Sequence, residues 1–118
     1  MDIIFVEGVT MDRGNLIVVL VTVPTEPEAD RITAVLLEQH LVACVNRIKG
    51  VASQFWWQGN IETADEILLI VKTTAEVMMD IVKAVKENHS YSVPEIIAVP
   101  IISGNEDYLL WIRGEVQK

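Results

Sequence analysis

The side chains best suited to bind a metal ion are few in this chain: one cysteine, Cys44, and two histidines, His40 and His89. A cysteine thiolate is a soft ligand for ions such as Cu(I), and a neutral imidazole binds copper or zinc through one ring nitrogen. Glu95, directly after Pro94, adds a carboxylate that could bind an ion or orient another ligand. Cys44, His89 and Glu95 are therefore the candidate metal ligands.

Each of these residues also has a purely structural interpretation. Cys44 lies in the apolar segment 42–45, and a free cysteine is commonly buried in a core. His89 is predicted at the end of a helix, where the helix dipole favours a cation, and His40 is interpreted in that way alone. Glu95 can equally cap the start of a strand. The residues alone leave both interpretations open.

No arrangement of residues for catalysis is recognisable in the sequence. There is no glycine-rich phosphate-binding loop and no nucleophile beside a plausible base. One cysteine and two histidines also fall short of the four ligands of a structural zinc site. We therefore expect a protein that is not an enzyme.

Aromatic residues suggest contacts between subunits. Trp56, Trp57, Tyr91 and Trp111 could form a wall on which a ligand stacks, but such residues more often anchor interfaces. Trp56 and Trp57 follow Phe55 near the tip of a predicted hairpin, and an isolated hairpin is only marginally stable in water. We expect Trp56, Trp57 and Tyr91 to be interface residues, with the hairpin lying against another subunit.

The elements that must position these residues alternate along the chain. Apolar β-branched runs indicate strands, and apolar residues at helical spacing indicate helices. The predicted segments are strands 16–23, 41–57, 61–73 and 95–102, and helices 25–40, 73–89 and 105 onward.

Local signals mark the ends of these elements. Thr25 with Glu28, and Thr73 with Glu76, are spaced as capping boxes at the starts of two helices. Lys49-Gly50 interrupts a β-rich run and indicates a bulge or bend in one long strand.

This order is the ferredoxin-like β-α-β-β-α-β pattern, an α+β fold with one antiparallel sheet and both helices on one face. The other face has only the short last helix and other copies of the chain to cover it. Hydrophobic residues make up 51% of 118 residues, which is high for a small soluble domain. We therefore expect an oligomer. Residues 16–118 should form a single domain, and residues 1–15 an N-terminal extension that is partly disordered.

The charge and the apolar runs limit the partners and the compartment. A net charge of −8 without a basic cluster argues against nucleic acid as a partner. The longest apolar runs are strand-sized, far short of the roughly 20 residues of a membrane span. Residues 1–15 lack the features of a signal peptide, and a single cysteine fits a reducing compartment. We expect a cytoplasmic protein with no membrane or nucleic-acid partner.

Four short motifs in order resemble the CutA family, and the resemblance runs from about residue 16 to residue 112. They are 41–46 (LVACVN), 56–59 (WWQG), 67–73 (ILLIVKT) and 89–96 (HSYSVPEI). The resemblance implies a ferredoxin-like fold with a long hairpin and a C-terminal helix. It also implies a tight homotrimer built by sheet packing and the hairpins, and tolerance of copper and other divalent cations.

The chain departs from the family where the metal ligands are expected. The family commonly has His-Pro-Tyr-Glu where this chain has His89, Ser90, Tyr91 and Ser92. Without a carboxylate at position 92, we expect binding of copper or another divalent cation to be weak. Two functions stay open: a metal-binding tolerance protein, or a sensor of small molecules or scaffold with clefts between subunits, as in the trimeric PII signalling proteins.

Overall fold

The protein is described by a computed structural model covering residues 2–6, 9–13 and 15–116. Seven strands, three α-helices and one short 3-10 helix, η1, follow one another along the described residues. In chain order they are β1 (Asp2–Val6), β2 (Val9–Arg13), β3 (Leu16–Val23), α1 (Glu26–Glu38), β4 (Cys44–Trp57), β5 (Asn60–Thr74), η1 (Ala75–Val77), α2 (Met78–Asn88), β6 (Ile96–Pro100), β7 (Ser103–Gly104) and α3 (Glu106–Glu115).

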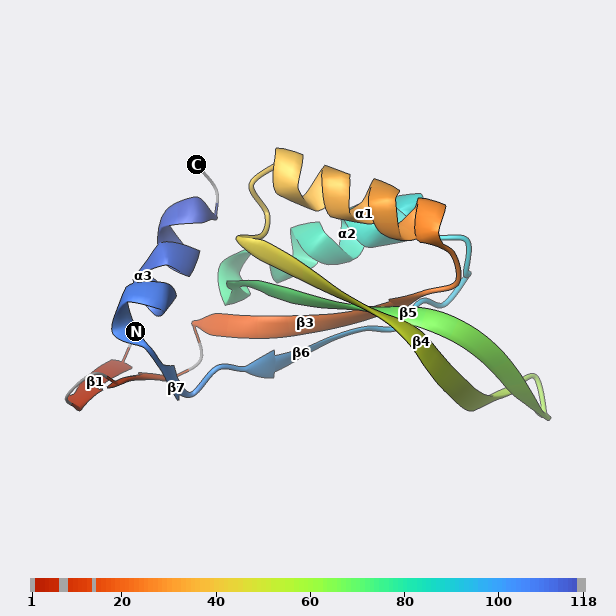
Figure 1. The fold of residues 1–118 in the computed structure, drawn as a ribbon, viewed down its shortest axis with the longest axis horizontal. Helices are drawn as coiled ribbons and strands as arrows, with labels where there is room; N and C mark the ends of the chain where they lie inside the picture. The colour runs from red at the N-terminus through yellow and green to blue at the C-terminus, as the bar shows by residue number, and fades with distance from the viewer. Residues whose placement is uncertain (1, 7–8, 14, 117–118) are drawn as a thin grey trace.

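The main sheet confirms the predicted ferredoxin-like fold. Its four strands run in the order β4-β5-β3-β6, and every neighbouring pair is antiparallel. Figure 1 shows α1 and α2 side by side over one face of this sheet, while α3 lies beyond one end of it. None of the helices within the described ranges combines the length and apolar character that a membrane span requires.

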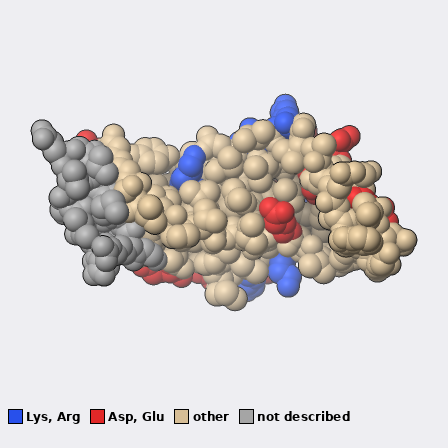
Figure 2. Space-filling view, turned by 90° about the horizontal axis from the view of Figure 1, so that it is seen from below, with Lys and Arg blue, Asp and Glu red and all other residues tan. Residues whose placement is uncertain are grey.

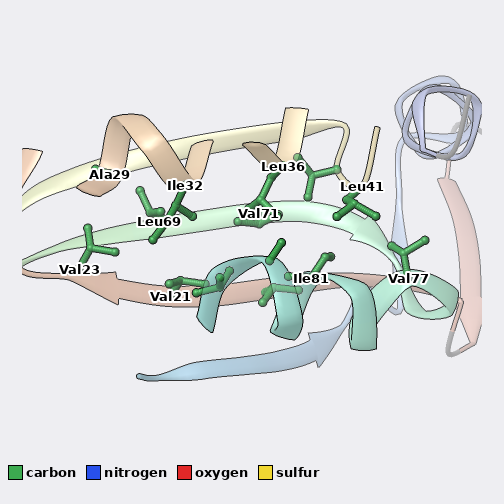
Figure 3. Packing of buried hydrophobic residues seen from close by; sticks show 14 of the residues in the cluster. Val21, Val23, Ala29, Ile32, Leu36, Leu41, Leu69, Val71, Val77 and Ile81 are labelled. Carbon is green, nitrogen blue, oxygen red and sulfur yellow. The ribbon is translucent and has the colours of Figure 1, made fainter. Parts of the chain in front are cut away.

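The core lies between this sheet and the two helices. Alternate residues of β3 and β5 point toward the helices, and α1 and α2 each pack an apolar stripe against them. In the close view of Figure 3, Val21 and Leu69 of the sheet lie opposite Ile32 of α1 and Ile81 of α2. A second, smaller cluster joins Leu16 to α3. Both helices therefore cover the same face and leave the other uncovered.

One of the two predicted capping boxes is wrong and the other is incomplete. Thr25 does cap α1, because its Oγ1 accepts a hydrogen bond from the backbone N of Glu28 at 3.3 Å. The Glu28 carboxylate accepts from the Thr25 hydroxyl at 3.2 Å and from the backbone N–H of Ser90 at 2.6 Å, instead of the backbone N–H of Thr25 that a capping box requires. Thr73 lies within β5 and caps no helix; its hydroxyl is buried and donates to the carbonyl of Leu41 at 2.6 Å. This buried bond between distant segments outweighs the local capping pattern.

The hairpin of β4 and β5 projects beyond the body of the domain, and we call residues 51–66 the arm (Figure 1). The predicted bulge is confirmed, since the register shifts between Ile48 and Val51, where Gly50 has a φ of 76°. At the tip, Gln58 and Gly59 both have positive φ values, as a two-residue hairpin turn requires. The bend separates the core-covered part of the hairpin from the arm.

We call the side of the main sheet that faces away from α1 and α2 the open face. Residues paired across neighbouring strands point to the same face of a sheet. The core residues and their cross-strand partners point to the helices, so the residues that alternate with them form the open face. Outside the arm its members are Val18, Leu20, Thr22, Cys44, Asn46, Ile48, Leu68, Ile70, Lys72, Ile97 and Val99. Most of these are apolar, and Figure 2 shows this side as a mostly uncharged surface with isolated charged side chains.

A second, smaller sheet joins the two ends of the chain. The backbone of β1 pairs with β2, and β2 pairs with β7 just before α3. That residues 1–15 are a partly disordered extension of a single domain at 16–118 stays a prediction.

Candidate functional site

Cys44 lies at the start of β4 on the open face, where it is half-buried. Its Sγ donates to Oδ1 of Asn46 at 3.6 Å, and the same amide oxygen accepts from Nζ of Lys72, the cross-strand partner of Cys44. Burial raises the pKa of the Tyr108 hydroxyl on α3, and the neighbouring Cys44 adds to that rise. A thiol, an amide, an ammonium group and a phenol therefore meet at this end of the open face.

His89 lies at the opposite end of the sheet, and both of its ring nitrogens are engaged. The backbone N–H of Tyr91 donates to Nδ1 at 3.0 Å, so Nδ1 is the acceptor. Nε2 then carries the proton and donates to the carbonyl of Thr22 at 2.7 Å. No lone pair of the imidazole is therefore available for a metal ion while these two bonds persist.

Two buried carboxylates accept hydrogen bonds from the residues that follow His89. Glu28 and Glu66 are each only 6% exposed. The backbone N–H of Ser90 donates to Oε1 of Glu28 at 2.6 Å, and the Tyr91 hydroxyl donates to Oε2 of Glu66 at 3.1 Å. The segment 89–91 is therefore tied to β3, to α1 and to the base of the arm.

These contacts shift two pKa values in opposite directions. Burial acts to raise the pKa of Glu28, but the hydrogen bonds from Ser90 and Thr25 outweigh it, so the pKa lies below its usual value. For Tyr91, burial and the bond to the Glu66 carboxylate both raise the pKa. Glu28 is consequently held as a carboxylate and Tyr91 as a neutral phenol.

The three predicted metal ligands are not brought together within one chain. Cys44 is paired across the strands with Lys72 of β5, whereas Thr22, which accepts the hydrogen bond of His89, is paired with Leu68 of β5. Lys72 and Leu68 are four residues apart along β5, so Cys44 and Thr22 are separated by about 13 Å along the strand direction. Glu95 is exposed and precedes β6. Across residues 15–116, no three histidine, cysteine, aspartate or glutamate side chains form a group that could hold a metal ion. The described residues of a single chain therefore do not provide a ligand set for a divalent cation.

The predicted interface aromatics differ in how freely they are exposed. Trp56 and Trp57 lie on the arm with 72% and 41% of their surface exposed. They are consecutive in a strand and so point to opposite sides of the arm. Tyr91 is half-buried, and its ring lies 4.9 Å from that of His89. Tyr91 thus has a clear role within its own chain.

Sequence reasoning missed the roles of Glu28 and Glu66. The spacing of Thr25 and Glu28 predicts a capping role for Glu28 and nothing more. Glu66 stands where β5 changes from a polar to an apolar half, which is a weak signal for a buried carboxylate. Their partners lie 62 and 25 residues away, and no local pattern indicates contacts at such separations.

Fold and site together define a ferredoxin-like α+β protein with a projecting hairpin and a half-buried thiol on an uncovered sheet face. Residues 17–115 match the family described as CutA1 divalent ion tolerance protein, and the chain belongs to that family. The hairpin of β1 and β2 lies outside the matched range.

Relatives of known sequence agree with this assignment. The divalent-cation tolerance protein CutA of Thermus thermophilus is 47% identical over 96 residues, covering 81% of this chain and 93% of the relative. The chloroplastic CutA 1 of rice is 41% identical over 102 residues, which cover 86% of this chain but only 58% of the rice protein. This chain therefore spans rather more than half of that relative.

Solved structures of the family share the fold. CutA1 from Oryza sativa superposes with a TM-score of 0.85 at 40% identity, covering 89% of this chain and 96% of the rice chain. The Thermus thermophilus protein gives 0.84 at 44% identity, with 86% and 98% covered. The Archaeoglobus fulgidus protein, described as a periplasmic divalent cation tolerance protein, gives 0.82 at 42% identity, with 85% and 97% covered.

Proposed function

We propose that this chain is a non-enzymatic, cytoplasmic divalent-cation tolerance protein that works as a homotrimer and binds copper weakly. Its family membership supports the role in tolerance of divalent cations. The observation that supports the homotrimer is the apolar open face of the main sheet. Ile48, Ile97 and Val99 on this face are 48%, 51% and 45% exposed in the single chain.

An uncovered apolar face of this kind favours association of copies. Monomeric soluble proteins rarely expose a large contiguous apolar patch. Covering the open face removes these side chains from water, and each Å² of apolar surface buried contributes about 25 cal/mol. The arm, with its exposed aromatics, extends the surface available for such contacts (Figure 1).

Copper binding in this proposal depends first on Cys44. A thiolate is a ligand that Cu(I) prefers, and Cys44 lies on the face that other copies would cover. The described residues of one chain do not form a full ligand set. The site must therefore be completed by other copies, or by a movement that frees the ring of His89 from the Thr22 carbonyl and the Tyr91 amide. Both requirements make binding weak.

Calorimetric titration with Cu(I), Cu(II) and Zn(II) tests the metal proposal. Cys44→Ala should abolish or strongly weaken copper binding, and His89→Ala should weaken it. His40→Ala is the matched control, because His40 is also a histidine that follows a helix but is not among the predicted ligands. Equal copper binding by the wild type, Cys44→Ala and His89→Ala contradicts the proposal.

A second candidate function is a trimeric sensor of small molecules, or a scaffold, with ligands in clefts between subunits. It is favoured by the engagement of both nitrogens of His89, which leaves that residue without a free lone pair. A thermal-shift screen with metabolites tests it. A metabolite that raises the melting temperature, together with no measurable metal binding, supports this candidate over the first.

A further inference from the structure

Lys72 is the one charged residue among the open-face positions of the sheet body. It lies on β5 between the core residues Val71 and Thr73, both fully buried on the helix side. The side chain of Lys72 is half-buried, and Nζ donates to the neutral amide of Asn46. The ion pairs found among residues 15–116 involve Arg47 and Lys49 and not Lys72.

An ammonium group at this position needs a partner once the face is covered. Its apolar neighbours include Val18 across the strand pair and Ile70 two residues along β5. If another copy covers this surface, the ammonium group loses the water that now solvates it. A buried charge is strongly destabilising unless an opposite charge pairs with it. The neutral amide oxygen of Asn46 does not supply that charge.

Acidic groups lie on the same side of β5, but on the arm. Every second residue of a strand faces the same way, so Glu62 and Glu66 share the side of Lys72. Glu66 is buried and already accepts a hydrogen bond from Tyr91. Glu62 is exposed, and its cross-strand partner is the exposed Phe55. Glu62 is thus a free carboxylate beside an apolar side chain suited to an interface.

Glu62 and Lys72 cannot meet within one chain. Ten residues of strand β5 separate them, a distance of about 33 Å. The open side of each copy therefore has a cation at one end and a carboxylate at the other. Two copies packed head to tail bring these opposite charges together, and three such contacts close a ring.

We propose that Glu62 on the arm of one copy pairs with Lys72 on the sheet of the next. This inference rests on the proposed homotrimer and names a residue that the neighbouring copy contributes. The pair lies beside Cys44 and Asn46, so the arm of the neighbour closes over the thiol. Wherever Lys72 is desolvated by assembly, the carboxylate of Glu62 neutralises it.

Charge reversal tests the pair directly. Lys72→Glu and Glu62→Lys should each raise the dissociation constant of the trimer by roughly 100-fold or more, because each places like charges together. The double variant restores opposite charges and should return to within about tenfold of the wild type. Lys83→Glu combined with Glu87→Lys is the matched control, since both residues are exposed on α2 and away from the open face.

A double-mutant cycle with uncharged substitutions covers the case in which a glutamate at position 72 prevents folding. Lys72→Met keeps the apolar stem and Glu62→Gln keeps the shape, so their effects on the dissociation constant should be non-additive. Suppose that the wild type is trimeric, that the reversed pair dissociates as readily as the worse single variant, and that the effects of Lys72→Met and Glu62→Gln are additive. The pairing of Glu62 with Lys72 is then wrong, while the proposed trimer still holds. A monomeric wild type overturns both the pairing and the proposed trimer.

Discussion

We expect neighbouring copies to cover both sides of the arm, so truncation of Trp56, which points to the side opposite Glu62 and Phe55, should weaken the trimer. In the single chain 72% of the Trp56 side chain is exposed, and it lies opposite Ile61, which is 61% exposed. A tryptophan presents up to about 250 Å² of surface, so about 180 Å² of it is available for burial by a neighbour. At about 25 cal/mol per Å², full burial contributes up to about 4.5 kcal/mol per copy. The same reasoning gives Trp57, which is 41% exposed, about 2.5 kcal/mol.

Sedimentation over a wide dilution series measures this effect. Trp56→Ala should dissociate at far higher protein concentrations than the wild type, and Trp57→Ala at intermediate ones. Met79→Ala is the matched control, because Met79 is 76% exposed but lies on α2, on the helix-covered side of the sheet. If Trp56→Ala remains as fully trimeric as Met79→Ala, the arm is not an assembly anchor, and its aromatics are free for another role such as stacking a ligand.

Three further predictions follow from the buried carboxylates and the metal hypothesis. Because folding lowers the pKa of Glu28, its contribution to stability is present above the ordinary carboxyl pKa and is lost as the pH falls through the lowered value. Glu28→Gln should therefore cost about 1–3 kcal/mol at neutral pH and flatten the fall in melting temperature in acid; an unchanged pH profile argues against it. Tyr91→Phe removes the hydroxyl donor from buried Glu66 and should cost about 1–3 kcal/mol by thermal or chemical unfolding, whereas a loss within error contradicts the role of this bond. Ser92→Glu should tighten Cu(II) and Zn(II) binding in calorimetry by adding an oxygen ligand; if neither Ser92→Glu nor Cys44→Ala changes binding, there is no metal site.

The fold could be predicted because its signals are local and agree with one another. The continuous β-branched run of β3 forms a central strand with β5 and β6 on either side. The Lys49-Gly50 interruption is the bulge where the arm begins. Thr73 was assigned wrongly because its spacing to Glu76 matches a cap, while its hydroxyl has a better, buried partner in the carbonyl of Leu41.

The candidate site could be predicted only in part. Cys44 and His89 were found because few residue types bind soft metals, but their separation across the sheet depends on strand register, which no short motif specifies. The ring nitrogens of His89 are hydrogen-bonded to two backbone groups, the carbonyl of Thr22 and the amide of Tyr91. Backbone partners of this kind carry no signature in side-chain type, so they become visible only in three dimensions.

The mass of the wild-type protein in solution tests the central claim most directly, because every proposed contact of the open face and the arm depends on assembly. Sedimentation equilibrium at micromolar concentration should give a single species of roughly 40 kDa, three times the 13.2 kDa of one chain. A folded species of 13.2 kDa under the same conditions would contradict the account, since it would show that the apolar open face is stable in water without another copy to cover it.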